Sequence, residues 1–172
     1  MTTNYPKPSV TVDTIIFALH KQDIKILLIK RKYPPFANKW AIPGGFVDVN
    51  EALPLAAARE LEEETGLKNV ELKQFYSFGD PGRDPRGHTI TVAYHTFLAN
   101  LPTEVVGADD ADKAEWFSIK SLPEMAFDHK EVLDLAINDL KNRIETTLRL
   151  TDFFSEELKI SDLRNINKIL DN

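Results

Sequence analysis

The stretch from residue 45 to residue 67, GFVDVNEALPLAAARELEEETGL, constrains the chain more than any other part of the sequence. Three successive alanines lead into the run RELEEE, whose residues favour a helix, and Gly66 offers a natural helix end. We therefore expect a helix of about three turns. Glycine, acidic, basic and aliphatic residues recur at fixed intervals through the stretch: Gly45, Glu51, Arg59, Glu60, Leu61, Glu63, Glu64, Gly66 and Leu67.

Three glutamates of this helix are expected to share one face. Glu60, Glu63 and Glu64 stand at i, i+3 and i+4, whereas Ala58 and Leu61 are expected to turn towards a core. Carboxylates this close repel one another, and a hard divalent cation such as Mg²⁺ or Mn²⁺ between them would relieve the repulsion. The alternative is a solvated acidic face, which is the common fate of a run of charges.

The residues just before the helix favour the metal site. A strand and a tight Gly-Gly turn are expected from Trp40 to Gly45, and such a turn can bring a backbone carbonyl close to the carboxylates. Arg59 precedes Glu63 by four residues and can also reach Glu51. We expect Arg59 to hold the carboxylates in register rather than to touch a substrate.

The intervals in residues 45–67 resemble the Nudix box, G-x5-E-x7-R-E-U-x-E-E-x-G-U, where U is aliphatic, at every fixed position. The resemblance implies an α/β fold, the Nudix α/β/α sandwich with a mixed central sheet. It implies hydrolysis of a diphosphate joined to another group X, with Mg²⁺ or Mn²⁺ as cofactor. The metal ligands that it implies are the carbonyl of Gly44 and the side chains of Glu60, Glu63 and Glu64. The catalytic residues that it implies are Glu51, Arg59, Glu63 and Glu64.

Length and composition limit the class of protein. At 172 residues, 42% of them hydrophobic, the chain has the size of one domain with a short extension. The net charge of −6 argues against a general nucleic-acid binder, because phosphate backbones attract basic surfaces. No cysteine is present, which excludes disulfides and thiolate-held zinc. The sequence has neither a signal peptide nor a membrane-length apolar run, so we expect a cytoplasmic protein without a membrane segment.

The remaining elements follow from apolar patterning. Strands are expected at residues 10–19, 24–29, 70–78, 89–98 and 116–119. A helix is expected over residues 128–146, and its core stripe is Val132, Leu133, Leu135, Ala136, Ile137 and Leu140. The chain is therefore divided into a flexible arm at residues 1–8, a Nudix domain at 9–147 and a helical extension at 148–172.

Residues 79–88 contain three glycines and two prolines and are expected to form a loop. Two arginines of this loop, Arg83 and Arg86, are well placed for a negatively charged ligand. The alternative is that they pair locally with Asp80 and Asp84.

The string R-D-P-R-G, followed by an aliphatic strand, resembles the ADP-ribose pyrophosphatase branch of the Nudix family. This resemblance implies ADP-ribose as the substrate, and AMP with ribose 5-phosphate as the products. His88 follows the glycine where that branch often has a bulkier basic residue, so it joins Arg83 and Arg86 as a substrate-binding candidate. Phe46 or Tyr76 could stack on adenine, or could belong to the core.

Two further charged clusters are open to more than one interpretation. An acidic loop is expected at residues 100–115, and its candidates for an extra metal ligand or the general base are Glu104, Asp109, Asp110 and Asp112. Their spacing does not choose between them, and Glu63 is the other candidate base. The basic residues 30–32 could face phosphates, or could simply form the charged end of a strand.

Residues 151–172 carry a second amphipathic pattern, typical of a last helix. They resemble the opening helix of the winged-helix domain that follows the Nudix domain in transcriptional regulators of NAD metabolism. A whole winged helix needs several tens of residues more, so we expect a packing or dimerisation appendage, or a chain cut before its DNA-reading part. We expect a homodimer that acts on a small nucleotide and does not bind nucleic acid specifically.

Three functions remain open at this stage: an ADP-ribose pyrophosphatase, a nucleotide sensor that regulates another process without turnover, and a house-cleaning nucleoside triphosphate pyrophosphatase. The three glutamates favour an enzyme, because a sensor need not keep carboxylates that repel one another in the absence of a metal ion.

Overall fold

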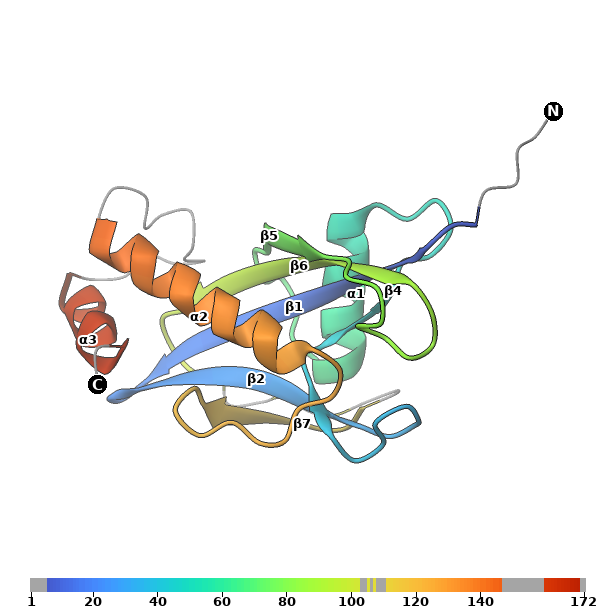
Figure 1. Cartoon of the computed structure of the whole chain (residues 1–172). Coiled ribbons are helices and arrows are strands. Elements are labelled where there is room, and N and C mark those ends of the chain that lie inside the picture. Colours follow the sequence, from blue (N-terminus) through green and yellow to red (C-terminus); the bar gives the residue numbers. More distant parts are fainter. Residues whose placement is uncertain (1–5, 103–104, 106, 108–110, 147–159, 171–172) are drawn as a thin grey trace.

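A mixed seven-stranded sheet forms the centre of the protein in the computed structural model (Figure 1). The structure describes residues 6–102, 105, 107, 111–146 and 160–170. Its elements, in chain order, are β1 (Ser9–His20), β2 (Asp23–Arg31), β3 (Trp40–Ala41), β4 (Gly44–Phe46), α1 (Leu53–Thr65), β5 (Lys73–Phe78), β6 (Thr89–Leu98), β7 (Ala111–Ser118), α2 (His129–Thr146) and α3 (Ile160–Leu170). The domain boundary expected after residue 147 and most of the expected arm lie outside the described residues.

Strand β1 is the centre of the sheet. It pairs antiparallel with β2 and β4, and parallel with β6 from Ser9 opposite Thr89 to Ala18 opposite Leu98. Strand β2 also pairs with β3 and β7, and β6 with β5, all antiparallel. A strand buried on both faces needs a nearly continuous apolar run, which the residues of β1 supply. The hairpin of β1 and β2 expected from the sequence is present.

Helices α1 and α2 cover opposite faces of the sheet (Figure 1), which confirms the α/β/α sandwich. On β1, Ile15 and Phe17 pack in one cluster with Leu133 of α2. The intervening Ile16 packs in a second cluster with Leu61 of α1. Because side chains alternate along a strand, this single strand contributes to both apolar layers and fixes the two helices relative to each other.

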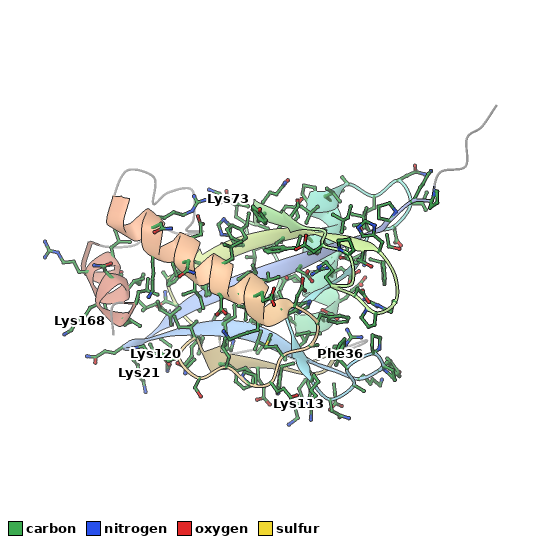
Figure 2. The ribbon with its side chains drawn as sticks, in the orientation of Figure 1. Lys21, Phe36, Lys73, Lys113, Lys120 and Lys168 are labelled. Carbon is green, nitrogen blue, oxygen red and sulfur yellow. The ribbon has the colours of Figure 1, made fainter. Side chains whose placement is uncertain are left out.

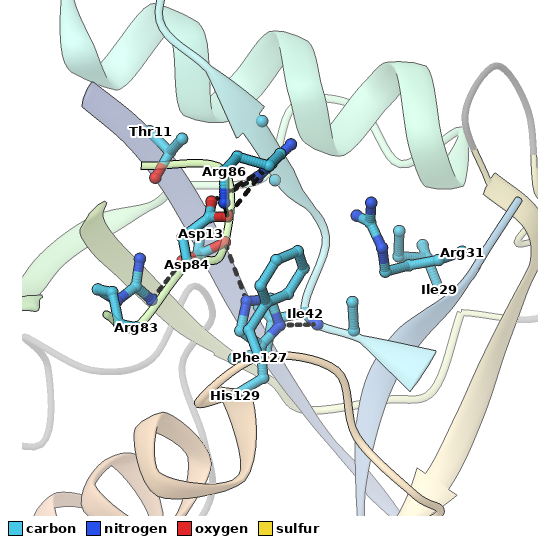
Figure 3. A pocket seen from close by; sticks show the side chains of 13 residues that line it. Thr11, Asp13, Ile29, Arg31, Ile42, Arg83, Asp84, Arg86, Phe127 and His129 are labelled. Carbon is cyan, nitrogen blue, oxygen red and sulfur yellow. Dashed lines mark hydrogen bonds and ion pairs between the residues drawn. The ribbon is translucent and has the colours of Figure 1, made fainter. Parts of the chain in front are cut away.

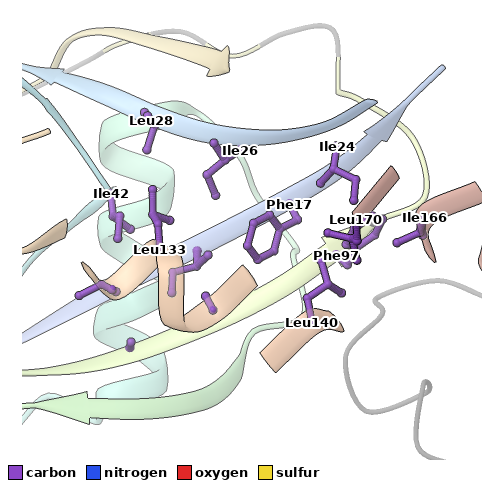
Figure 4. Packing of buried hydrophobic residues seen from close by; sticks show 14 of the residues in the cluster. Phe17, Ile24, Ile26, Leu28, Ile42, Phe97, Leu133, Leu140, Ile166 and Leu170 are labelled. Carbon is purple, nitrogen blue, oxygen red and sulfur yellow. The ribbon is translucent and has the colours of Figure 1, made fainter. Parts of the chain in front are cut away.

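Helix α3 completes the α2 layer at the tip of the β1–β2 hairpin (Figure 4). Ile166 and Leu170 are buried in the same cluster as Ile24, and the Asn165 side chain donates a hydrogen bond of 3.0 Å to the carbonyl of Lys21. The labelled residues Lys21 and Lys168 lie at the opposite end of the sheet from Phe36 (Figure 2). The last helix expected from the sequence is therefore present and belongs to the core.

Two helical residues expected in the core are exposed. On α1 the buried face runs through Ala57 and Leu61, which leaves Ala58 in solvent. On α2 the face towards the sheet is filled by residues such as Leu133 and Ala136, and Leu135 remains 40% exposed. None of the helices in the described ranges is long and apolar enough to span a bilayer.

Strand β7 begins at Ala111, whereas the sequence places its start at Trp116. Ala111 and Ala114 are small and buried, and they pack in the cluster that also contains Leu61 of α1. The pairing of β7 with β2 therefore includes residues that the sequence assigned to an acidic loop. In this part of β7 the buried Ala111 and Ala114 are separated by exposed charged residues.

We expect Ile166→Ala to lower the free energy of unfolding by about 2–5 kcal/mol, because the substitution leaves a cavity in the cluster that joins α3 to the sheet. Urea denaturation of the whole chain measures the effect. The matched control is Arg164→Ala, an exposed position on the same helix, which should change stability by less than about 0.5 kcal/mol. Equal stabilities for the two variants would contradict the packing of α3.

Candidate active site

Gly44 and Gly45 lie where β4 comes closest to its neighbours. A β-carbon on Gly44 would clash with the carbonyl oxygen of Val12, and one on Gly45 would clash with the carboxylate of Glu60. Space therefore requires glycine at Gly44, where the obstacle is backbone, whereas a side chain on Gly45 would displace the carboxylate of Glu60. The expected tight Gly-Gly turn is wrong: both residues belong to β4 and pair with Val12 and Asp13 of β1, and neither has a positive φ.

Glu64 joins α1 to this strand. One carboxylate oxygen, Oε2, accepts a hydrogen bond of 2.8 Å from the backbone N–H of Gly44. The side chain is buried on the inner face of the helix, and burial raises the pKa of Glu64 to about 8. A cation bound beside this carboxyl group would favour its ionised form.

Arg59 connects the acidic side chains of α1 with the preceding loop. Its Nε and Nη2 atoms each donate to a different oxygen of Glu51 at 2.8 Å, while Nη1 donates to Glu60 at 2.8 Å and to Glu63 at 3.1 Å. Nη2 also donates to the carbonyl of Phe46 at 3.2 Å. The hydrogen bonds from Arg59 are the largest cause that lowers the pKa of Glu51 to about 2. Both contacts expected for Arg59, with Glu51 and Glu63, are present.

The glutamates line a cleft of about 300 Å³ together with Gly44 and Arg59. Carboxylate oxygens are donors that suit Mg²⁺ or Mn²⁺. As the side chains stand, Arg59 engages Glu60 and Glu63, and in the described ranges no three acidic or histidine groups converge on one point. The donor set fits a divalent cation once Glu60 or Glu63 turns from Arg59 towards Glu64.

Arg83 belongs to a buried layer of charges behind the cleft (Figure 3). Its Nε and Nη2 atoms donate to the two oxygens of Asp128 at 2.8 and 2.7 Å, and Nη2 lies 4.0 Å from the carboxylate of Asp13. Only 6% of the Arg83 side chain is exposed. The expected alternative, a side-chain pair with Asp80, is wrong for this arginine, because its partner is at the start of α2.

His129 supports β3 from the same layer. Its Nδ1 accepts a hydrogen bond of 2.9 Å from the backbone N–H of Ile42, so this nitrogen carries no proton, and Nε2 lies 3.9 Å from Asp13. Burial lowers the pKa of His129, and the charges of Arg83 and Arg31 act in the same direction, whereas Asp13 and Asp128 oppose them. The neutral ring is therefore the form that fits this site.

Arg86 stands between the buried layer and the open cleft. It donates through Nε and Nη2 to the carboxylate of Asp84, at 2.7 Å in the shortest contact, so the local pair expected as an alternative is present here. Burial on its own would raise the pKa of Asp84, but hydrogen bonds from Arg86 hold it below its usual value. The guanidinium also lies 4.8 Å from the Phe46 ring centroid and 5.4 Å from that of Phe127. Its side chain remains 40% exposed and lines the cleft with the glutamates.

The other candidates from the sequence lie away from the glutamates. His88 is exposed, with Nε2 3.1 Å from the carbonyl of Gly79. Tyr76 is 54% exposed on β5, where its ring contacts Phe78, and Asp112 is exposed on β7. None of these side chains lines the cleft of the glutamates. Three candidates from the acidic loop lie outside the described residues: Glu104, Asp109 and Asp110.

Three residues that line or support the cleft were not candidates from the sequence: Asp13, Phe127 and Asp128. Arg31 is one of the basic residues 30–32 that the sequence allowed to face phosphates, and in the structure it lines the cleft. A signal exists for Asp13, which is a charged residue within an apolar strand. Phe127 and Asp128 meet the site only through the fold.

The model of the NUDIX domain matches residues 7–136 of the chain. The protein belongs to the Nudix family. It is 43% identical over 129 residues to an ADP-ribose pyrophosphatase of Methanocaldococcus jannaschii. This match covers 75% of this chain and 73% of that protein. It is 34% identical to the ADPR responsive transcriptional repressor NtrR of Acinetobacter baylyi, over 97% of this chain and 68% of the repressor. A solved MutT/nudix family protein from Enterococcus faecalis matches with a TM-score of 0.84 at 31% identity, over 99% of this chain and 76% of that one.

We expect Glu64→Gln to abolish the rise in melting temperature that Mg²⁺ or Mn²⁺ gives the wild-type Nudix protein, and to lower kcat about a hundredfold or more. The amide oxygen can still accept the hydrogen bond from Gly44, so the fold should persist by circular dichroism. Glu62→Gln is the matched control, since Glu62 is exposed on the same helix and pairs with Lys68. A full metal-induced shift in the Glu64 variant would remove the proposed metal site.

We expect the free energy of unfolding to fall as the pH drops below about 6.5, in part because the unfolded chain protonates His129 whereas the folded site holds Nδ1 without a proton. In His129→Gln an amide oxygen can accept the same hydrogen bond without titrating, so the slope of stability against pH should be smaller. Urea denaturation at several pH values measures it. His88→Gln, at an exposed ring, is the control and should keep the wild-type slope. Identical slopes in all three proteins would exclude His129 as the source.

Proposed function

We propose that the protein hydrolyses the diphosphate of a nucleoside diphosphate linked to a second group, and that ADP-ribose is the substrate, with AMP and ribose 5-phosphate as products. The observation that carries this proposal is a single cleft lined by Glu60, Glu63 and Glu64 together with Arg31 and Arg86. Such a cleft can take a metal-bound diphosphate against the acidic helix and bind its remaining charge through the arginines. The 43% identity to an ADP-ribose pyrophosphatase supports the choice of nucleotide.

Mg²⁺ or Mn²⁺ would be held by the carboxylates of Glu60, Glu63 and Glu64 and by the carbonyl of Gly44. When bound, the ion would neutralise charge on the diphosphate and lower the pKa of the attacking water. Glu63 is the most exposed of the three glutamates and is our candidate for the base that takes the proton from this water, with the loop acids as the alternative. Arg59 acts as a positioning residue, since it holds Glu60 and Glu63.

Glu51 is the anchor for that positioning role. It accepts two hydrogen bonds from Arg59 and one of 3.0 Å from the backbone N–H of Asp48. Both oxygens of the Glu51 carboxylate therefore accept hydrogen bonds from the Arg59 guanidinium. We propose that Glu51 contributes to turnover through Arg59 rather than through contact with the substrate.

On the substrate side, Arg86 would bind the phosphate or the terminal ribose, and Phe46, 44% exposed beside it, offers a ring face to adenine. Arg83 would act by holding the loop in place, because its guanidinium is engaged by Asp128. His88 keeps a role only if a ligand reaches the outer side of the loop, where its ring is exposed.

A nucleotide sensor is the second candidate, favoured by the similarity to a transcriptional repressor over 97% of the chain. In a sensor, α3 would transmit nucleotide binding from the Nudix core to another protein segment. Its packing in the same cluster as α2 supports such a role. We propose turnover rather than sensing, with no specific binding of DNA by these residues, and a cytoplasmic homodimer as the working form. Light scattering and an anisotropy titration with DNA at physiological salt test the last two points.

The assay that decides between the functions is release of AMP or phosphate from ADP-ribose, NADH, diadenosine polyphosphates and oxidised dGTP, each with and without Mg²⁺. Metal-dependent release of AMP from ADP-ribose is the expected result. Binding of ADP-ribose without turnover would favour the sensor, and preference for the triphosphate would favour a house-cleaning pyrophosphatase.

We expect Arg86→Ala to lower kcat/KM for ADP-ribose by about ten- to a hundredfold, since it removes a charge-assisted contact of about 1.5–3 kcal/mol. Arg86→Lys should recover only part of the loss, because a point charge does not reproduce the planar fork. Because Arg86→Ala leaves the buried carboxylate of Asp84 with a backbone N–H donor but without its guanidinium partner, thermal unfolding of both variants checks that they are folded at the assay temperature. Steady-state kinetics within about twofold of wild type for both variants would exclude a substrate contact.

A further inference from the structure

Phe127 lines the smaller cavity behind the cleft, together with Arg31 and Arg86, and has a backbone conformation that aromatic residues rarely adopt. Its φ is 51°, in the left-handed region. A bulky residue stays there only when its surroundings require it, and such strain gathers at functional sites. Its ring contacts that of Phe36 at a centroid distance of 4.8 Å and that of His129 at 5.2 Å. The ring is thereby fixed from two sides.

Two guanidinium groups are placed by this ring. The Cζ atom of Arg31 lies 4.9 Å from the Phe127 centroid, and that of Arg86 lies 5.4 Å from it. In Figure 3 Arg86 lies above the Phe127 ring and Arg31 to the right of it. They come from β2 and from the loop after β5, so the fold alone brings them together. Aromatic faces attract cations, which allows one ring to hold both side chains.

Arg31 is oriented into the cleft by its own loop. Its Nε donates to the carbonyl of Pro35 at 2.9 Å, and Nη2 donates to that of Tyr33 at 3.4 Å. It lines both the open cleft of the glutamates and the smaller cavity behind it, and so does Arg86. The three glutamates of the acidic helix line the same open cleft as Arg31. Arg31 therefore faces the acidic helix across the cleft.

Arg31 and Arg86 both line the cleft opposite the glutamates, and Arg86 does so while its Nε and Nη2 atoms hold Asp84, so an anion in the cleft meets two guanidinium groups at fixed positions. A diphosphate carries charge on both phosphates and offers planar pairs of oxygens to planar forks. We propose that Phe127 positions Arg31 and Arg86 as a two-arginine clamp for the phosphates of a diphosphate-linked ligand, with Arg31 as the second phosphate-binding residue. This inference rests on the proposed function and extends it to two residues, Arg31 and Phe127.

Calorimetric binding of ADP-ribose to the whole chain in EDTA, where turnover is prevented, tests the clamp. Arg31→Ala should weaken binding by about tenfold or more, and Arg31→Lys should recover part of the loss. Lys32→Ala removes the same charge from the neighbouring exposed residue and should stay within about twofold of wild type. Equal affinities for Arg31→Ala and Lys32→Ala would overturn the role of Arg31.

The positioning role of Phe127 needs a readout that general destabilisation would not give. Phe127→Leu removes the aromatic face and should weaken binding about three- to tenfold, whereas Phe127→Tyr keeps the face and should bind nearly as wild type. In the Arg31→Ala background, Phe127→Leu should cost less affinity than in wild type, because one of the two side chains it holds is already gone. Additive losses in the double variant would overturn the positioning role.

The same titrations separate failure of the clamp from failure of the proposed function. Wild-type binding of ADP-ribose with no effect of Arg31→Ala overturns the clamp and leaves the proposed function standing. Wild-type turnover of a different diphosphate overturns the choice of ADP-ribose, and the clamp is then tested by kcat/KM for that substrate with the same variants. A wild-type protein that binds none of the diphosphates in EDTA and turns none of them over with Mg²⁺ overturns both.

Discussion

The close approach of α1 to β4 determines the geometry of the whole cleft. Because Gly45 carries no side chain, the carboxylate of Glu60 lies directly against the strand, and Glu64 of the same helix accepts a hydrogen bond from the backbone N–H of Gly44. The same approach lets Arg59 reach the carbonyl of Phe46 while it holds its glutamates. If α1 were displaced away from β4, the hydrogen bond between Glu64 and Gly44 and that between Arg59 and Phe46 would both be lost. The spacing of the Nudix box is thus a packing requirement as well as a chemical one.

The two walls of the cleft carry opposite charges, although the protein as a whole has a net charge of −6. The wall formed by α1 is acidic and becomes attractive to a diphosphate only with a cation bound. The opposite wall carries Arg31 and Arg86, and both stack on Phe127. A small polyanion can therefore be bound by an acidic protein, because what it meets is the local arrangement of two guanidiniums rather than the average charge.

The parts of the site that depend on helical or strand periodicity could be predicted from the sequence, and the parts that depend on tertiary contacts could not. The shared face of Glu60 and Glu63 and the contact of Glu63 with Arg59 follow from the 3.6-residue repeat, whereas the contact of Arg59 with its neighbour Glu60 does not. The role of the glycines was misread because a close approach, like a turn, selects glycine. Asp128, directly before α2, pairs with Arg83 across 45 positions of the chain, and no local pattern signals that pairing.

Arg83 and Arg86 show how packing separates residues that sequence treats alike. They stand three positions apart in one loop, yet the Arg83 side chain is 6% exposed and the Arg86 side chain 40%. Loss of Arg83 would remove a buried guanidinium together with its two hydrogen bonds to Asp128, which connect the loop to the residue directly before α2. Loss of Arg86 would remove a more exposed guanidinium, and the buried carboxylate of Asp84 would keep a backbone N–H donor at 2.9 Å. Reduced activity in an Arg83 variant would therefore reflect a displaced loop, whereas in an Arg86 variant it would report on the substrate.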